Sequence, residues 1–385
     1  MLRLALASRS QAATAAPLRS AGTRKVTAAA APSAPPATDA DVAALVSAFQ
    51  DSRRLVVLTG AGCSTESGVP DYRSPQGAYS TGFKPMTHQQ FLASPANRAR
   101  YWARSFYGWP RFSATQPNAA HLALAELEQR GWVSGLVTQN VDRLHSAAGS
   151  RRVLELHGTT HRVICLGCGR TSPRSALQTQ LAALNPAAAA HLAALLGRPV
   201  DPEAEREQAL RVGSSGDNIR VAVSTPSAAS PPSTTPASTP GSPSPGSSSS
   251  TFPPAPGSPP QQRPDGDVEL ADAGGGFAVP PCAACGGLLK PDVVFFGDNI
   301  AHEVKDRAAA LVGSADALLV VGSSVQVFSA FRLVEAAKRA GARLVMVNVG
   351  PTRADKLADL KVEARAGEVM SRLARHPSLQ LPKLC

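Results

Sequence analysis

The sequence predicts an α/β fold: a doubly wound, Rossmann-like parallel sheet with a smaller domain beside it. Short apolar runs rich in valine and leucine alternate with stretches of helical periodicity, which is typical of a parallel sheet covered by helices on both faces. Several of these runs end in turns of glycine or small polar residues, and two CxxC pairs stand outside the alternation. One large domain and one small domain account for both patterns.

The large domain begins with a helix and a strand. A helix is predicted over Asp41–Ser52 and a buried parallel strand over Leu55–Leu58. The helix carries apolar residues at helical spacing, namely Val42, Leu45, Val46 and Phe49. The strand is followed by Gly60-Ala61-Gly62, small residues that let backbone N–H groups approach a pyrophosphate at a helix start.

A second helix and strand follow. Pro117 and Asn118 open a predicted helix that runs through Gln129 and ends at Gly131. Its inward face is expected to carry Leu122, Leu124, Ala125 and Leu127. The next predicted strand is Val133–Thr138.

The C-terminal part of the chain completes the sheet. The apolar runs Ala317–Val321 and Arg343–Val347 are predicted strands, and Phe328–Arg339 between them is a predicted helix. Gly322–Ser324 follows the first of these strands, and Asn348–Gly350 follows the second. Together with the turns after the two earlier strands, four polar or glycine-rich turns converge on one edge of the sheet.

This edge predicts a dinucleotide site. Ligands of doubly wound sheets bind beyond the carboxyl ends of the strands. One such turn alone is ordinary strand-to-helix punctuation, but the four together favour a binding site. A GxGxxG motif is absent, and no acidic residue ends a second strand about 20 residues on, which argues against an ordinary hydride-transferring dehydrogenase.

A histidine and a polar cluster belong to the same edge. His157 lies between the strand-like Val153–Leu156 and Gly158, where the backbone can turn sharply. A lone histidine in such a place is more often structural than catalytic, yet an imidazole with an unperturbed pKa of about 6.5 suits proton removal at neutral pH. The polar residues Asn140 and Asp142, after the second strand, favour the catalytic interpretation.

Two segments are not expected to belong to the folded core. Residues 1–38 hold five basic and no acidic residues among many Ala, Ser and Thr, a composition typical of an organellar transit peptide. Residues from about 205 to 264, and most clearly from Ser214 on, are dominated by Ser, Pro, Thr, Ala and Gly, which predicts a disordered insertion. We therefore expect a protein of the mitochondrial matrix, with the chloroplast as the alternative.

Charge and hydropathy exclude other classes of protein. Five positive charges of the formal +11 lie in the leader, which leaves +6 on the remainder. Basic residues are not interleaved with aromatic residues, so we expect no nucleic-acid partner. No run approaches the ~20 apolar residues of a membrane span, so we expect no membrane partner either.

Four cysteines predict a structural zinc site. The two CxxC pairs are Cys165 with Cys168 and Cys282 with Cys285, each followed by glycine, and four thiolates can complete a tetrahedral shell. Although 113 residues separate the pairs, loop closure costs entropy only logarithmically. A disulfide pair or a redox CxxC fits less well, because an organelle matrix is usually reducing and no WCGPC context is present. Cys63 and Cys385 stand outside this set, and Cys63 is expected to be a small packing residue.

Several motifs in order carry a family resemblance. Gly60–Arg73 reads GAGCSTESGVPDYR, Thr138–His145 reads TQNVDRLH, Leu156–Gly158 reads LHG, and the CxxC pairs follow. With these motifs, the chain from about Val42 to Met370, apart from the insertion, resembles the sirtuin family of NAD-dependent protein deacylases. The segments most similar to class II mitochondrial sirtuins are Tyr101–Arg104, Gly108–Pro110, Lys290–Asp298 and Asn348–Arg353.

The resemblance implies NAD and zinc as cofactors. It places the following residues at the NAD site: Gly60, Ala61, Gly62, Ser64, Thr65, Glu66, Pro70, Asp71, Tyr72, Arg73, Tyr79, Gln139, Asn140, Val141, Asp142, Gly322, Ser323, Ser324, Asn348, Val349, Gly350 and Ala366. Close relatives have Cys at the position of Ala366, but a backbone contact there tolerates the change. Asp71 and Arg73 would lie in a loop that closes over the reacting centre.

The resemblance also implies the catalytic roles. The acyl oxygen of a modified lysine would attack the ribose carbon of NAD as nicotinamide leaves, and His157 would then deprotonate a ribose hydroxyl. Asn140, with Gln139, would position the ribose and a water, and Asp142 would hold the nicotinamide pocket. Mono-ADP-ribosyl transfer is a second activity reported for the subgroup, and a catalytically idle NAD-sensing scaffold is the alternative of a different class.

The substrate is expected to be an acyl-lysine protein, bound as an extended peptide along Val293–Gly297, which resembles the family's substrate strand. Family members selective for acidic acyl chains carry a Tyr-x-x-Arg pair where this chain has Ser105 and Gly108, and Tyr101 with Arg104 is one turn out of register. We therefore expect a deacylase of unspecified acyl preference, possible substrates being lipoyl-like or branched chains.

The expected organisation has five parts. The first and second parts of the Rossmann-like NAD-binding domain span 39–162 and 291–375, and the zinc-binding module spans 163–290 and contains the insertion. Residues 1–38 are the leader and residues 376–385 a C-terminal tail. The protein is expected to be a monomer.

Overall fold

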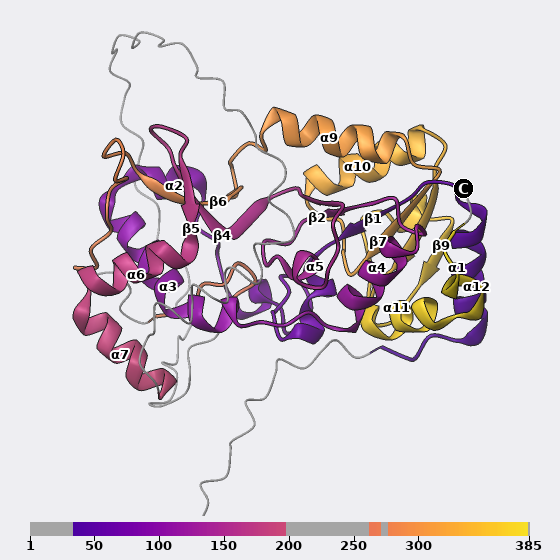
Figure 1. Ribbon diagram of the computed structural model, residues 1–385, viewed down its shortest axis with the longest axis horizontal. Coiled ribbons are helices and arrows are strands. Elements are labelled where there is room, and N and C mark those ends of the chain that lie inside the picture. The colour runs from indigo at the N-terminus through magenta and orange to yellow at the C-terminus, as the bar shows by residue number, and fades with distance from the viewer. Residues whose placement is uncertain (1–33, 198–261, 271–275, 384–385) are drawn as a thin grey trace, which may run out of the picture.

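The computed structural model describes residues 34–197, 262–270 and 276–383. Within these residues, a large parallel sheet covered by helices lies beside a smaller antiparallel sheet with its own helices (Figure 1). Residues 1–33 of the expected leader and residues 205–261 of the expected insertion lie outside the described residues.

The large sheet has six parallel strands in the order β3-β2-β1-β7-β8-β9. Their bounds are β1 Leu55–Thr59, β2 Gly135–Thr138, β3 Val153–Glu155, β7 Ala317–Val321, β8 Arg343–Val347 and β9 Leu360–Val362. The strand order reverses between β1 and β7, so the carboxyl ends of these strands border the crevice where doubly wound folds bind ligands. This confirms the predicted fold class.

Helices cover both faces of this sheet (Figure 1). One face packs against α1 (Asp39–Asp51), α4 (Ala119–Gln129), α11 (Ala366–Arg375) and the short α12 (Pro377–Gln380). The other face packs against α9 (His302–Gly313) and α10 (Phe328–Arg339). The strands are buried on both sides, which explains why they read as continuous apolar runs. None of the helices among these residues has the length and apolarity needed to cross a membrane.

Two local expectations about the large domain were wrong. Leu122 was expected to face inward, but it is 54% exposed because the buried face of α4 runs through Ala120, Leu124 and Leu127 instead. The strand expected from Val133 begins at Gly135, since the Val133 N–H still bonds to the Leu127 carbonyl at the end of α4.

The leader was expected to reach residue 38, but residues 37 and 38 already belong to the fold. Thr38 caps α1 through a capping box with Asp41. Ala37 is buried, and its backbone N–H donates to Glu368 at 3.0 Å. Composition cannot mark this boundary, because Ala and Thr suit a leader and a helix cap equally.

The small sheet is antiparallel, in the order β5-β4-β6, with β4 Gly158–Cys165, β5 Thr171–Pro173 and β6 Leu289–Val293. Around it lie α2 (His88–Ala93), α3 (Pro95–Ser113), α6 (Arg174–Leu184) and α7 (Pro186–Leu196). The core between them holds Phe91, Trp102, Phe106 and Leu181. Helices α2 and α3 thus pack on the small sheet, whereas the expected boundaries placed them in the large domain. The remaining short helices in the described part of the chain are α5 (Leu144–Ala147) and four single turns at Ala61–Cys63, Thr65–Ser67, Ala78–Thr81 and Asp355–Leu357.

The end of the predicted disordered insertion is ordered, which corrects the boundary at Pro264. Gln262 forms a β-bridge with Val268, and both are buried. Arg263 is 5% exposed, lies 3.9 Å from the centre of the Phe83 ring and pairs with Asp267 at 3.5 Å. The charged residues in this stretch pair with other residues of the fold. A composition averaged over the long neighbouring Ser/Pro run does not distinguish this ordered stretch from the rest of the insertion.

Candidate active site

A cavity of about 1240 Å³ lies at the carboxyl ends of β1, β2, β7 and β8 and extends to the end of β6. The predicted turns after these strands all line it, through Gly60, Gln139, Gly322 and Asn348 among others. The predicted convergence of the four turns on one edge is therefore observed. The volume exceeds the roughly 300–1,000 Å³ of ordinary small-molecule pockets, so it has room for a dinucleotide and part of a second substrate.

Backbone crowding explains the glycines of the cradle. A Cβ on Gly60 would lie 2.7 Å from the Ser323 hydroxyl oxygen, and one on Gly62 would lie 2.8 Å from the Gly322 carbonyl oxygen. Gly322 itself has φ +59°, a conformation that favours glycine, and its Cβ would meet the Cys63 nitrogen at 2.3 Å. At these three positions the turns after β1 and β7 are packed too closely for a side chain, and a phosphate group can approach their backbone.

The same edge stores backbone strain at Val325. This buried β-branched residue has φ +51° and lines the cavity. Such a conformation is an outlier for valine and persists only where the surroundings impose it. The Ser323 hydroxyl contributes, because it accepts hydrogen bonds from the Val325 N–H at 3.2 Å and from Gln139 Nε2 at 2.8 Å. The hydrogen bond from Gln139 to Ser323 thus holds the β7 turn against the β2 turn.

Asn140, Ser64 and Asp142 form one buried hydrogen-bond network. Asn140 Nδ2 donates to the Gly60 carbonyl and to Ser64 Oγ, each at 3.0 Å. Ser64 Oγ donates to Asp142 Oδ2 at 2.7 Å, and the Leu144 N–H donates to Asp142 Oδ1 at 3.0 Å. Burial raises the pKa of Asp142, and these hydrogen bonds lower it part of the way back. The network fixes the floor of the cavity and brings two of the three predicted catalytic residues together.

His157 is held in one tautomer at the side of the cavity. Its Nδ1–H donates to the Gln139 carbonyl at 3.0 Å, so Nε2 carries the lone pair and accepts from the Ser329 hydroxyl at 2.9 Å. Burial lowers the pKa of His157, and the hydrogen bond to Gln139 raises it part of the way back. The imidazole is therefore a neutral base at physiological pH, with Nε2 free for any hydroxyl that replaces Ser329.

The segment Asp71–Tyr79 folds into a compact loop over the cavity. Asp71 Oδ1 accepts from the N–H groups of Arg73 and Ser74 at 2.9 and 2.8 Å. The rings of Tyr72 and Tyr79 lie 5.4 Å apart, and the Arg73 guanidinium lies 5.3 Å from the Tyr79 ring. Pro70 is the one predicted NAD-site residue outside the cavity lining, because it faces a separate small hollow.

Two cavity residues with a chemical role in the site were missed by the sequence reasoning. Ser329, at the start of α10, contacts the base but has no motif around it. Asp265 lines the cavity from the returning end of the insertion, beside Tyr72. Burial raises the pKa of Asp265, while Arg263 and Arg104 lower it part of the way back. The acidic pair of the PDGD stretch was a signal, but it was assigned to the disordered insertion.

The positions expected to select acidic acyl chains are closed. Ser105 accepts a hydrogen bond from the buried Arg174 at 3.2 Å. Gly108 lies against the Gly266 carbonyl oxygen, which a Cβ would approach to 2.1 Å. Arg104 donates to the Val268 carbonyl at 3.1 Å and does not line the cavity. The segment 262–268 thus takes the space that a Tyr-x-x-Arg pair would need.

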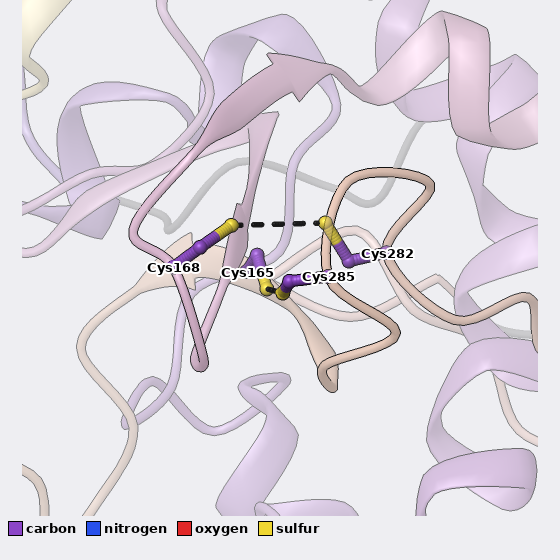
Figure 2. A group of neighbouring side chains, drawn as sticks. All are labelled: Cys165, Cys168, Cys282 and Cys285. Carbon is purple, nitrogen blue, oxygen red and sulfur yellow. Dashed lines mark hydrogen bonds between the residues drawn. The ribbon is translucent and has the colours of Figure 1, made fainter.

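The four cysteines of the two CxxC pairs meet at the tip of the small sheet (Figure 2). The Sγ atoms of Cys165 and Cys285 are 3.5 Å apart, and those of Cys168 and Cys282 are 3.8 Å apart. Four thiolates around zinc, at a bond length of about 2.3 Å, have sulfur atoms about 3.8 Å apart. The Gly167 N–H donates to Cys165 Sγ at 3.3 Å, which supports a thiolate. The set fits a structural zinc ion.

The expected substrate strand continues from β6 along the cavity. Val293–Asp298 lines it, and the Val294 N–H donates to the His157 carbonyl at 2.9 Å. The Phe296 carbonyl accepts from the His88 N–H at 2.9 Å, and the Phe296 side chain remains 40% exposed. The segment is thus tied to the base on one side and to α2 on the other.

Comparison with known proteins gives one consistent family. Residues 60–205 and 261–329 match the model of the Sir2 family. The chain is 44% identical to the NAD-dependent protein deacylase SRT2 of Arabidopsis thaliana, over 92% of this chain and 81% of that protein. It is 40% identical to the mitochondrial NAD-dependent protein lipoamidase sirtuin-4 of Bos taurus, over 88% of this chain and 87% of that protein.

Solved structures of Sir2 proteins are similar to this chain in fold. A structure described under "Structural Basis for the Mechanism and Regulation of Sir2 Enzymes" covers 89% of this chain and 99% of its own, with a TM-score of 0.57 and 26% identity. A second structure, a Sir2 protein with p53 peptide and NAD+, covers 86% of this chain and 95% of its own, with a TM-score of 0.54 and 25% identity.

Proposed function

This chain belongs to the Sir2 family, and from that premise we propose that it is an NAD-dependent protein-lysine deacylase, which moves an acyl group from lysine to ADP-ribose and releases nicotinamide. The observation that carries the proposal is the meeting of a neutral base, His157, with a glycine cradle and a buried amide-carboxylate network in one cavity. Bound NAD supplies an electrophilic ribose carbon and a leaving nicotinamide.

Three parts of the cavity serve the proposed reaction: the base, the amide-carboxylate network and the Asp71–Tyr79 loop. His157 Nε2 accepts the proton of a ribose hydroxyl that takes the place of Ser329, and the Gln139 carbonyl stabilises the resulting imidazolium through Nδ1–H. Asn140 and Asp142 are fixed by Ser64, so Asn140 can orient the ribose and Asp142 can hold the nicotinamide pocket without reorganisation. The Asp71–Tyr79 loop excludes water from the reacting carbon.

The pH profile tests the role of the base. Only neutral His157 can accept a proton, and burial places its pKa below the ordinary 6.5. Turnover should therefore persist as the pH falls to 6.5 and be lost only below that value. The measurement is kcat/KM against pH with a saturating second substrate. An acid limb at or above pH 6.5 would contradict this assignment.

The acyl-lysine substrate is proposed to lie as an extended peptide against Val293–Gly297, with its acyl chain directed into the cavity. Asp265 places a carboxylate in the lining of the same cavity, and the Tyr-x-x-Arg positions are closed. We propose that the acyl chain is neutral, as in lipoyl-like or branched chains, and that acidic chains are disfavoured by like charge.

Replacing Asp265 should relax this discrimination. Asp265→Asn is expected to raise turnover of succinyl-lysine or glutaryl-lysine peptide about tenfold relative to a neutral acyl peptide, which corresponds to ~1.4 kcal/mol. The matched control is Asp267→Asn, because Asp267 pairs with Arg104 and Arg263 and lies outside the cavity lining. An unchanged ratio in the Asp265 variant, or an equal change in the control, would refute the assignment.

The function itself is tested by nicotinamide release from NAD with a panel of acyl-lysine peptides. Release should require both NAD and an acylated peptide, and the preferred peptide names the acyl group. Release without any acyl peptide would favour hydrolysis or ADP-ribosyl transfer instead.

We also propose an organellar location, in the mitochondrial matrix. The basic, acid-free residues 1–33 support it, as does the bovine relative, which is named as mitochondrial. A chloroplast location is the alternative, and import of a fluorescent fusion separates the two.

A further inference from the structure

A second cluster of metal-binding side chains lies behind the cavity, apart from the four cysteines. Cys63, His121 and His145 come from the turn after β1, from α4 and from α5, and one donor atom of each lies within 4.8 Å of the others. Their exposed fractions are 1%, 0% and 1%. A thiol and two imidazoles together in a protein core form the kind of donor set that zinc prefers.

His145 presents a free lone pair. The Thr59 hydroxyl donates to Thr138 at 2.9 Å and therefore accepts from the His145 Nε2–H, also at 2.9 Å. The other ring nitrogen, Nδ1, is left without a proton, and among the described residues it has no hydrogen-bond partner. A ligating histidine commonly donates its second N–H to a protein oxygen in this way, so ligation through Nδ1 would leave the hydrogen bond to Thr59 in place.

The charges around the cluster favour a cation. Burial lowers the pKa of His145 to about 3 and that of His121 well below its usual value, so both rings stay in the neutral form that binds metals. Burial, and then the carboxylates of Asp142 and Glu66, raise the pKa of the Cys63 thiol beyond its ordinary range. The same carboxylates stabilise a divalent ion. With a Cys63 thiolate and the Asp142 carboxylate, Zn²⁺ forms a neutral group.

We propose that Cys63, His121 and His145 form a second zinc site, weaker than the four-cysteine site, and that filling it stops turnover at the adjacent cavity. Binding releases the thiol proton of Cys63 to solvent and forms one Zn–S and two Zn–N bonds. In a tetrahedral site these donors lie roughly 3.3 to 3.6 Å apart, so the cluster must close by about 1 Å.

His121 explains why the site is the weaker one. Its Nδ1 accepts from the Asn118 N–H at 3.3 Å, so its proton is on Nε2, which lies 3.4 Å from Ser64 Oγ. Ligation through Nε2 moves that proton to Nδ1 and breaks the hydrogen bond from Asn118. The lost hydrogen bond lowers the affinity for zinc, whereas the four-cysteine site is preformed and loses no such bond.

The same closure reaches the cavity. Ser64 bridges Asn140 and Asp142, and it follows Cys63 directly in the chain. Drawing Cys63 and His121 together pulls Ser64 from that bridge. The inhibition thus rests on the proposed deacylase function, whereas the binding of zinc does not.

The test counts zinc first and activity second. Full-length protein that holds zinc at the four cysteines is equilibrated with buffered free Zn²⁺, and bound zinc is measured by mass spectrometry and X-ray absorption. We expect a second ion whose addition brings nitrogen into the average ligand shell, with a loss of turnover of about tenfold or more. Cys63→Ser and Cys63→Ala should bind one ion less and keep their turnover. Cys385→Ser, which removes a cysteine that is not among the proposed ligands of either site, should behave as the unchanged protein.

Two results would overturn the proposal. One is that the unchanged protein takes up no zinc beyond the four-cysteine site. The other is that both Cys63 variants bind as much zinc as the unchanged protein. Zinc uptake can be measured even if no acyl peptide supports turnover, so failure of the deacylase assignment and failure of this site are distinguishable. If zinc binds at the three residues but turnover persists, the inhibitory half of the proposal is wrong.

Discussion

His157→Ala is expected to lower NAD-dependent deacylation about a thousandfold, within the range of 10²–10⁴ that positioned acid–base groups contribute. Nε2 is the ring nitrogen that can act as a base, because Nδ1–H donates its hydrogen bond to the Gln139 carbonyl oxygen. NAD should still bind, since the glycine cradle and the Asn140 network do not depend on the imidazole. The measurement pairs steady-state nicotinamide release with NAD binding by calorimetry.

Two variants control this result. His302→Ala removes an exposed histidine of α9 that pairs with Asp306 and should leave turnover unchanged. Ser329→Ala should lower turnover less than about threefold, because the substrate hydroxyl replaces Ser329 on Nε2 and the serine is not needed in the reacting complex. Near-normal turnover by His157→Ala would remove the histidine from the mechanism.

Much of the site could be predicted from sequence because a parallel sheet imposes its own geometry. Once Leu55–Leu58 and Ala317–Val321 are read as buried strands, Gly60 and Gly322 must meet at their carboxyl ends, and in the structure they pack too closely for a side chain. The four cysteines could be paired across 113 residues because ligand chemistry, and not proximity in the chain, defines the site.

Contacts that depend on the path of a loop could not be predicted. Asp265 reaches the cavity because its neighbour Arg263 is fixed by Phe83 and Asp267. Phe83 is far from Arg263 in the sequence, and the ion pair with Asp267 forms only in the folded chain. Val325 adopts φ +51° against its own preference, so its local sequence argues for another conformation. Leu122 was placed on the wrong face because helical spacing alone does not say which side of α4 meets α11.

Loss of the four-cysteine zinc is expected to have the second large effect, on stability. The site ties the end of β4 to the turn before β6 across the insertion, and β6 continues into the segment that contacts His157. Without the ion, four thiolates lose their counter-charge and a very long loop loses its closure. Cys282→Ser should lower the free energy of unfolding of the smaller domain, which is built on β4, β5 and β6, by several kcal/mol. It should also lower Tm by about 10 °C or more.

Loss of the four-cysteine zinc should also lower catalytic efficiency, although the catalytic residues are unchanged. If β6 detaches from β4, the pairing of Gly158 with Val293 opens and the substrate strand leaves the base. We therefore expect KM for the acyl peptide to rise more than KM for NAD, measured on Cys282→Ser beside Cys385→Ser. Chelation of the ion should reproduce the change, and zinc should restore it in the unchanged protein. Equal stability of both variants would mean that the four cysteines do not carry a structural metal.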